Sequence, residues 1–228
     1  MEQESVLAAL RFEAGQLIRE MANLSEDQWR LPTRCTPWKV NDLLAHVRMV
    51  LAWLPGVLIA PEPAVHAEVS AAEYYRADDR FSPDTNTTRI AIARDLAASK
   101  LSGAALAADF AATWQLAEQL CRAEPDDRVV LTRHGDLMLL SEFLLTRVVE
   151  VAVHGLDLAD ALGREPWLTV QAGNLVQGFL LGLTSTDALR ELGWTQLRFL
   201  RKATGREPIT GQEAAEIDRL GIRWLTVG

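Results

Sequence analysis

The amino-acid sequence predicts an all-α protein, a bundle of helices packed around an apolar core. Three observations predict this fold class. Apolar residues recur at steps of three and four between residues 5 and 24, which is the spacing of an amphipathic helix. Residues 88–121 are rich in alanine, the strongest helix former. Residues 141–163 are apolar on almost every side, as expected for a helix at the centre of a bundle.

A second helix in the first half of the chain has start and stop signals. We expect it to begin at Thr36-Pro37, because threonine is a good N-cap and proline is tolerated at the first helical position. Pro55 should end it. The proline-containing connection that follows, residues 55–84, includes a short helical turn at residues 71–76.

The second half of the bundle is predicted from breakers and caps. The alanine-rich helix should break or kink at Gly103. β-Branched residues followed by a glycine turn predict a short hairpin or an extended linker at residues 128–138. Ser141 is expected to cap the central helix, and Gly163 is expected to end it.

The last part of the chain, after Pro166, should be a helical extension packed on the bundle. Its pattern predicts helices at residues 169–183, 185–203 and 210–220. The tail at residues 222–227 is predicted to be a strand or a packed extended end.

Composition and charge exclude several function classes. The 228 residues carry a formal net charge of −8 and concentrate Lys and Arg nowhere, which argues against nucleic-acid binding and favours a small-molecule ligand. The chain has only two cysteines and an N-terminus unlike a signal peptide, so we expect a cytoplasmic protein. No apolar run reaches the roughly 20 residues of a membrane span. The protein should be a monomer or a homodimer.

Three side chains are candidate metal ligands. Glu150 and His154 lie four residues apart on the central helix, so both project from one face. His46 lies on the apolar stripe of the second helix and should face the same interior. Two imidazoles and one carboxylate suit a divalent metal and leave a coordination position open, as in catalytic zinc sites. Zinc is the first choice, and nickel, iron or manganese also fit this ligand type.

Neighbouring residues allow more than one interpretation. Arg147 lies one turn before Glu150 and either forms a buried ion pair with it or holds an anionic part of a substrate. Asp157 could accept a hydrogen bond from His154 and fix its tautomer. For Asp42 a favourable interaction with the helix dipole is sufficient explanation. Cys35 is expected to pack as a small residue beside Trp38.

Two segments of the chain resemble a known family. They are LPTRCTPWKVNDLLAHV, residues 31–47, and RVVEVAVHGLDLADALGREP, residues 147–166. Both are similar to the mycothiol-dependent maleylpyruvate isomerase family, a branch of the DinB-like metal-binding four-helix bundles. The resemblance implies an up-down bundle over residues 1–165, and it implies that His46, Glu150 and His154 are the metal ligands. Residues 166–228 look shorter and more helical than the C-terminal domain of the founding isomerase, a domain implicated in thiol binding.

The resemblance also implies a chemistry. It indicates an enzyme whose metal binds mycothiol as a thiolate, for S-transfer or conjugation, or for cis-trans isomerisation of a small electrophilic substrate. Arg147 and Asp157 are then the expected catalytic residues, and the partners are a small-molecule substrate and the thiol. Two alternatives remain open: a metal-dependent hydrolase that activates water, and a non-catalytic metal- or ligand-binding bundle.

Overall fold

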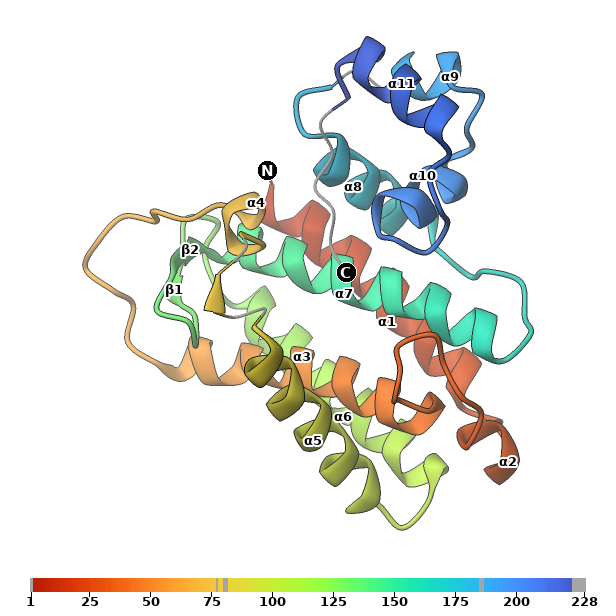
Figure 1. Ribbon diagram of the computed structural model, residues 1–228. Helices are drawn as coiled ribbons and strands as arrows, with labels where there is room; N and C mark the ends of the chain where they lie inside the picture. The colour runs from red at the N-terminus through yellow and green to blue at the C-terminus, as the bar shows by residue number, and fades with distance from the viewer. Residues whose placement is uncertain (1, 77, 80–81, 185–186, 223–228) are drawn as a thin grey trace.

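Four long helices form the bundle in the computed structural model, which describes residues 2–76, 78–79, 82–184 and 187–222 (Figure 1). They are α1 (Gln3–Met21), α3 (Val40–Ile59), α6 (Gly103–Arg122) and α7 (Leu140–Ala161). Helices α1 and α3 each pack against both α6 and α7, so the four helices enclose one core. The largest fully buried side chains include Leu10, Leu17, Leu43, Leu51 and Phe110. The predicted all-α, DinB-like four-helix bundle is therefore confirmed.

Shorter elements complete the chain. Before the central helix these are α2 (Glu26–Trp29), α4 (Ala71–Tyr74), α5 (Pro83–Ala98), β1 (Val129–Leu131) and β2 (Leu137–Leu139). After it come α8 (Val170–Leu181), α9 (Asp187–Glu191), α10 (Gln196–Ala203) and α11 (Gly211–Leu220). The two strands pair antiparallel, with Val130 opposite Met138, and confirm the predicted hairpin. Gly135 has a φ of 83° in the turn between them, a conformation that favours glycine.

The second bundle helix differs from its prediction at both ends. It begins three residues after Pro37, with Lys39 at the N-cap position, and the Thr36-Pro37 peptide is cis in the loop before it. The carboxylate of Asp42 accepts a hydrogen bond from the Lys39 backbone N–H at 3.0 Å, so the helix start is capped from within its first turn. The helix also continues through Pro55 to Ile59 although proline removes a backbone hydrogen bond, and Leu54 and Leu58 on either side of it are buried in the core.

The predicted break at Gly103 is confirmed, and a second predicted helix is also divided in two. The alanine-rich segment forms α5 and α6, and the Ser102 hydroxyl caps α6 by accepting the N–H of Ala105. A Cβ on Gly103 would lie 2.2 Å from the Trp29 ring, so the absence of a side chain lets α6 begin against that ring. The segment predicted at 185–203 contains α9 and α10, separated at Gly193, where φ is 65°.

The remaining differences are smaller. Helix α7 begins at Leu140 with Leu139 at its N-cap position, so Ser141 lies inside the helix and is not its cap. Of the tail predicted at 222–227, only Ile222 belongs to the described residues. Helices α8 and α11 follow their predictions, with Thr169 and Thr210 as capping residues.

Helix α3 is the one described helix that is long and apolar enough to qualify as a membrane span by length and composition. This corrects the expectation that no segment would qualify. However, 56% of the most apolar 18-residue stretch of this helix is buried inside the protein, where the helix packs against α6 and α7. A helix in a protein core can be equally long and apolar, so length and composition alone are weak evidence for a membrane span.

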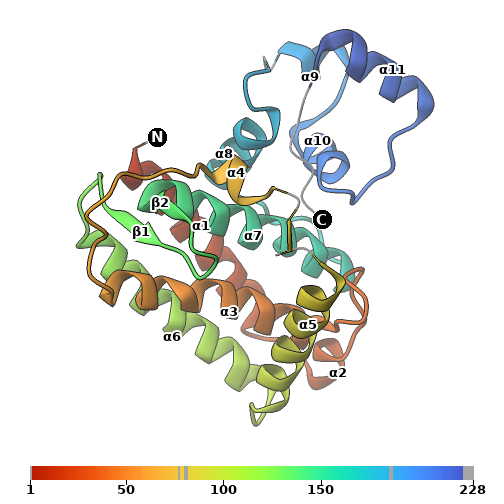
Figure 2. The same ribbon diagram turned by 60° about the vertical axis from the view of Figure 1, so that its left-hand side comes forward.

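The C-terminal helices lie on the α1 and α7 side of the bundle (Figure 1 and Figure 2). Helix α8 packs against both α1 and α7, and α10 packs against α8. The segment from α8 to α11 is called the C-terminal extension below.

A buried carboxylate joins the extension to the bundle. Glu13 of α1 is 1% exposed, and its Oε2 accepts hydrogen bonds from the backbone N–H and the hydroxyl of Thr169, at 2.9 and 2.6 Å. Its Oε1 has no hydrogen-bond partner among the described residues. Burial raises the pKa of Glu13 above 4.5, and the bonds from Thr169 offset part of that effect.

Replacing Glu13 with glutamine is expected to remove a pH-dependent loss of stability. The folded protein holds this proton more tightly than the unfolded chain, so its free energy of unfolding falls as the pH rises from about 4.5 through the raised pKa. Glutamine keeps an acceptor for Thr169 but does not ionise. Urea unfolding at several pH values from 4 to 8 should therefore show a gain for E13Q over the wild type that grows with pH.

A second substitution controls for the hydrogen bonds. Glu13→Ala leaves the N–H of Thr169 without its acceptor and should cost about 1–3 kcal/mol. A constant difference between E13Q and the wild type across this pH range would contradict the prediction.

Candidate metal centre

The three candidate ligands converge at the interface of α3 and α7. The Nε2 atoms of His46 and His154 each lie 3.4 Å from Oε2 of Glu150. The ligand atoms of the three residues all lie within 4.8 Å of one another. His46 comes from the middle of α3 and the other two from consecutive turns of α7, so helix packing brings together residues that are 104 positions apart.

These separations fit a bound cation. Two ligand atoms that are each about 2.1 Å from a tetrahedral zinc ion lie about 3.4 Å apart. The same distance is long for a hydrogen bond between an imidazole and a carboxylate. The donor set of two imidazole nitrogens and one carboxylate oxygen suits zinc and several other divalent metals. Both the geometry and the chemistry of His46, Glu150 and His154 therefore fit a divalent ion.

Burial and aromatic packing hold the histidine rings in place. The His46 side chain is 7% exposed, and the His154 side chain is 14% exposed. Trp38 stacks on the His46 ring with centroids 4.7 Å apart, and the two imidazoles meet edge to face at 5.1 Å. The Nδ1 of His46 is buried with no hydrogen-bond partner among the described residues. Packing against Trp38 therefore orients this ring.

The electrostatics keep the central carboxylate charged. Burial raises the pKa of Glu150, but its polar contacts with His154 and His46 and their charges lower it well below its usual value. Burial lowers the pKa of His154, but contacts with Asp157, Cys35 and Glu150 raise it well above its usual value. For His46, burial is the largest effect and the pKa is lowered. The site thus presents a half-buried negative charge between two imidazoles.

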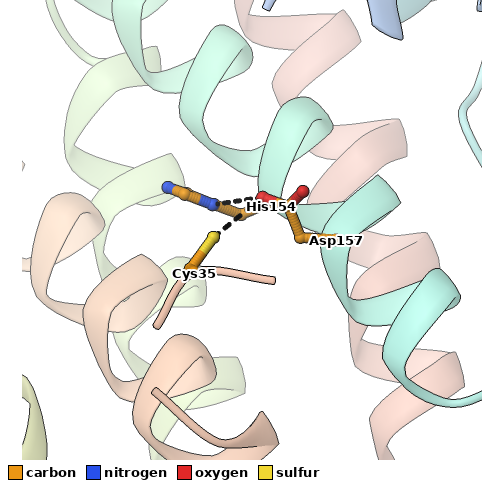
Figure 3. A group of neighbouring side chains, drawn as sticks. All are labelled: Cys35, His154 and Asp157. Atoms are coloured by element: carbon orange, nitrogen blue, oxygen red, sulfur yellow. Dashed lines mark hydrogen bonds and ion pairs between the residues drawn. The ribbon is translucent and has the colours of Figure 1, made fainter. Parts of the chain in front are cut away.

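Asp157 lies one turn beyond His154 and binds its other ring nitrogen. The Oδ2 of this fully buried carboxylate is 3.0 Å from Nδ1 of His154 (Figure 3). The Sγ of Cys35 donates to the same oxygen at 3.3 Å. Cys35 is half-buried and makes a polar contact, which differs from the simple packing expected beside Trp38.

The cluster of Cys35, His154 and Asp157 is a second group whose spacing could hold a metal. Two arginines argue against a cation there. Arg206 bonds both oxygens of Asp157, at 3.1 and 2.8 Å, and Arg34 lies 3.8 Å from Oδ1. A cation in this group would lie beside guanidinium groups, so the group of His46 and Glu150 is the better metal site.

Arg147 does not contact Glu150 directly. Within the described part of the chain the two residues form no ion pair, so that interpretation of Arg147 is wrong. Arg147 is buried and donates to the carbonyl of Val50 and the hydroxyl of Tyr74, each at 3.3 Å. Burial lowers its pKa, but the charges of Tyr74 and Glu150 raise it overall. Arg147 is thus a buried cation between α3, α4 and α7.

Sequence reasoning did not identify several residues around the site. Trp38 stacks on His46, and Arg206 and Arg34 contact Asp157. Tyr75 lies near Glu150, and burial together with the charge of Glu150 raises its pKa well above 10.0. The only sequence signal for Arg206 was its place directly after Gly205, where a helix ends. Nothing in the sequence links it to Asp157.

Fold and site together define a four-helix bundle with two histidines and one glutamate grouped between two of its helices. Residues 10–159 match the family model described as mycothiol maleylpyruvate isomerase N-terminal domain. The chain belongs to this family.

Relatives and solved structures agree with this membership. Two uncharacterized proteins of Mycobacterium tuberculosis, MT0041 from strain CDC 1551 / Oshkosh and Rv0036c from strain ATCC 25618 / H37Rv, are each 32% identical to this chain over 161 residues. The match covers 69% of this chain and 56% of each relative, so the chain matches little more than half of their length. The crystal structure of the mycothiol-dependent maleylpyruvate isomerase superposes with a TM-score of 0.60 at 18% identity, covering 91% of this chain and 90% of that one. The crystal structure of a mutant of the same enzyme superposes with a TM-score of 0.59 and covers the same fractions of the two chains. At this identity the likeness shows the shared fold.

Proposed function

We propose that this protein is a metal-dependent enzyme that uses a low-molecular-weight thiol, mycothiol, on a small electrophilic substrate. The observation that carries the proposal is the convergence of His46, Glu150 and His154 with separations that suit one cation. Family membership and the likeness to the mycothiol-dependent maleylpyruvate isomerase support the thiol. Two free cysteines, Cys35 and Cys121, are consistent with a reducing cytoplasm.

Each residue has a role in this proposal. His46, Glu150 and His154 would hold the divalent ion, with zinc as the first choice. Such an ion lowers the pKa of a bound thiol or water, so that a nucleophile is available at neutral pH. Asp157 orients His154 through its Nδ1. Arg147 places a buried positive charge beside Tyr74 and can attract an anionic part of the substrate.

The same thiol chemistry serves either outcome. A thiolate that adds to a carbon–carbon double bond moves the electron pair onto an adjacent carbonyl group. Rotation about the resulting single bond and loss of the thiolate give the cis-trans isomer, with the thiol regenerated. Protonation of the adduct gives a stable conjugate. The substrate therefore decides between isomerase and S-transferase activity.

Turnover with different thiols tests the proposal. Protein loaded with zinc should convert α,β-unsaturated carbonyl compounds, maleylpyruvate among them, when mycothiol is present, and more slowly or not at all with other thiols. Elemental analysis should find about one divalent ion per chain. Hydrolysis that survives removal of every thiol would support a water-activating hydrolase instead. Stoichiometric metal without turnover on any substrate would favour a binding protein.

A further inference from the structure

Arg206 of the C-terminal extension reaches the metal centre through Asp157. Its Nε and Nη2 donate to Oδ1 and Oδ2 of Asp157 at 3.1 and 2.8 Å. The two side chains are 9% and 0% exposed, so the bidentate pair is shielded from water. Arg206 follows α10 and Asp157 lies on α7, so this contact joins the extension to the helix that carries Glu150 and His154.

The backbone around Arg206 is held by two independent features. Gly205, with φ of 71°, ends α10 in a left-handed cap, in which the N–H groups of Gly205 and Arg206 donate to the carbonyls of Lys202 and Arg201. Arg34 binds the same turn from the other side, donating to the carbonyls of Gly205 and Arg206 at 3.0 and 2.8 Å. The side chain of Arg206 therefore starts from a fixed position.

The contacts of Asp157 determine which ring nitrogen of His154 carries the proton. Oδ2 of Asp157 also faces Nδ1 of His154 at 3.0 Å. Both oxygens of Asp157 accept hydrogen bonds from the guanidinium group, so the Nδ1 of His154 that faces Oδ2 is placed to donate a hydrogen bond to it. The Nε2 of a neutral His154 then has a free lone pair, and this atom is the one that lies 3.4 Å from Glu150.

We propose that Arg206 is a positioning residue of the metal centre: by holding both oxygens of Asp157 in place, it fixes the His154 ring in the orientation and tautomer whose Nε2 can bind a cation. The C-terminal extension is thus part of the metal site as well as a packed appendage. This inference rests on the metal-binding part of the proposed function and is independent of the thiol and the substrate.

The chain offers a matched control for a purely structural role. Arg201 of α10 also binds an aspartate of α7, Asp160, through two hydrogen bonds of 2.7 and 2.6 Å. That pair also joins the C-terminal extension to α7, but it lies one turn farther from His154. If Arg206 only fastened the extension to α7, then loss of either arginine should have the same effect on the metal centre.

The test compares Arg206→Met and Arg201→Met with the wild type, using zinc affinity and the tautomer of His154. Zinc affinity is measured by competition with a chelator, and ¹⁵N NMR reports the ring nitrogens after the metal is removed, at an alkaline pH where the His154 ring is neutral, with only four histidines to assign. We expect R206M to weaken zinc binding by about 10-fold or more, as loss of such supporting partners does, and to convert a pure Nδ1–H signal of His154 into a mixture. R201M should leave both readouts unchanged.

Arg206→Lys keeps the proposal testable if R206M does not fold. Lysine keeps the charge but cannot bind both oxygens in one plane, so it should weaken zinc binding in the same direction by a smaller factor. Unchanged affinity and tautomer in folded R206M or R206K would overturn the inference, as would an equal loss in R201M. If the wild type itself binds no zinc, it is the proposed metal centre that fails.

Discussion

Glu150→Ala is expected to abolish metal binding at micromolar metal and, with it, any metal-dependent turnover. Glu150 supplies the single carboxylate of the ligand set, and its Oε2 lies 3.4 Å from both imidazole Nε2 atoms. Its removal also leaves His46 and His154 without their shared partner. Since loss of a supporting residue around a metal typically costs 10–100-fold in affinity, loss of a ligand should cost more than about 100-fold. Elemental analysis and chelator competition measure this directly.

Two further substitutions separate the effect of the charge from a general effect of mutating α7. Glu150→Gln keeps the shape but removes the charge, and it should retain only weak binding. Glu142→Ala is the matched control, because Glu142 lies two turns earlier on α7 and its carboxylate accepts the N–H of Ala71 at 2.8 Å, away from the imidazoles. E142A should keep full metal content. Recovery of E150A with one tightly bound metal per chain would mean that these residues are not the ligands.

Asp157→Ala should destabilise the fold as well as the metal centre. The substitution leaves the guanidinium group of Arg206, 9% exposed, without its carboxylate, and it leaves Nδ1 of His154 without its acceptor. Removing one partner of a buried ion pair costs about 3–5 kcal/mol, because the remaining charge stays in a site that water does not reach. Urea unfolding of protein stripped of metal measures this cost without any contribution from a bound ion.

Asp160→Ala provides the comparison for that experiment. Asp160 forms its ion pair with Arg201 at the surface, with 38% of its side chain exposed. Exposed pairs contribute about 0–1 kcal/mol, so D160A should unfold at nearly the wild-type urea concentration. Equal destabilisation of D157A and D160A would show that Asp157 is no more buried in solution than its neighbour one turn along.

Local patterns in the sequence were enough to predict the fold class and part of the site. Helical periodicity and apolar content predicted the bundle helices, because those properties depend on residues three and four positions apart. The same periodicity placed Glu150 and His154 on one face of α7 and made Asp157 a candidate partner of His154. These contacts lie within one helix, so its regular geometry determines them.

Only the tertiary structure decided which distant residues meet. The distance from His46 to Glu150 depends on how α3 packs against α7, and no local pattern sets that packing. The contacts of Arg206 with Asp157, and of Arg147 with Tyr74, join segments separated by 49 and 73 positions. The sequence predicted the break at Gly103, but only the structure showed the contact with Trp29 that leaves no room for a side chain there. Sequence alone determined which face of each helix is apolar. The shared core decided which of these faces lie together, because close packing allows few arrangements of their side chains.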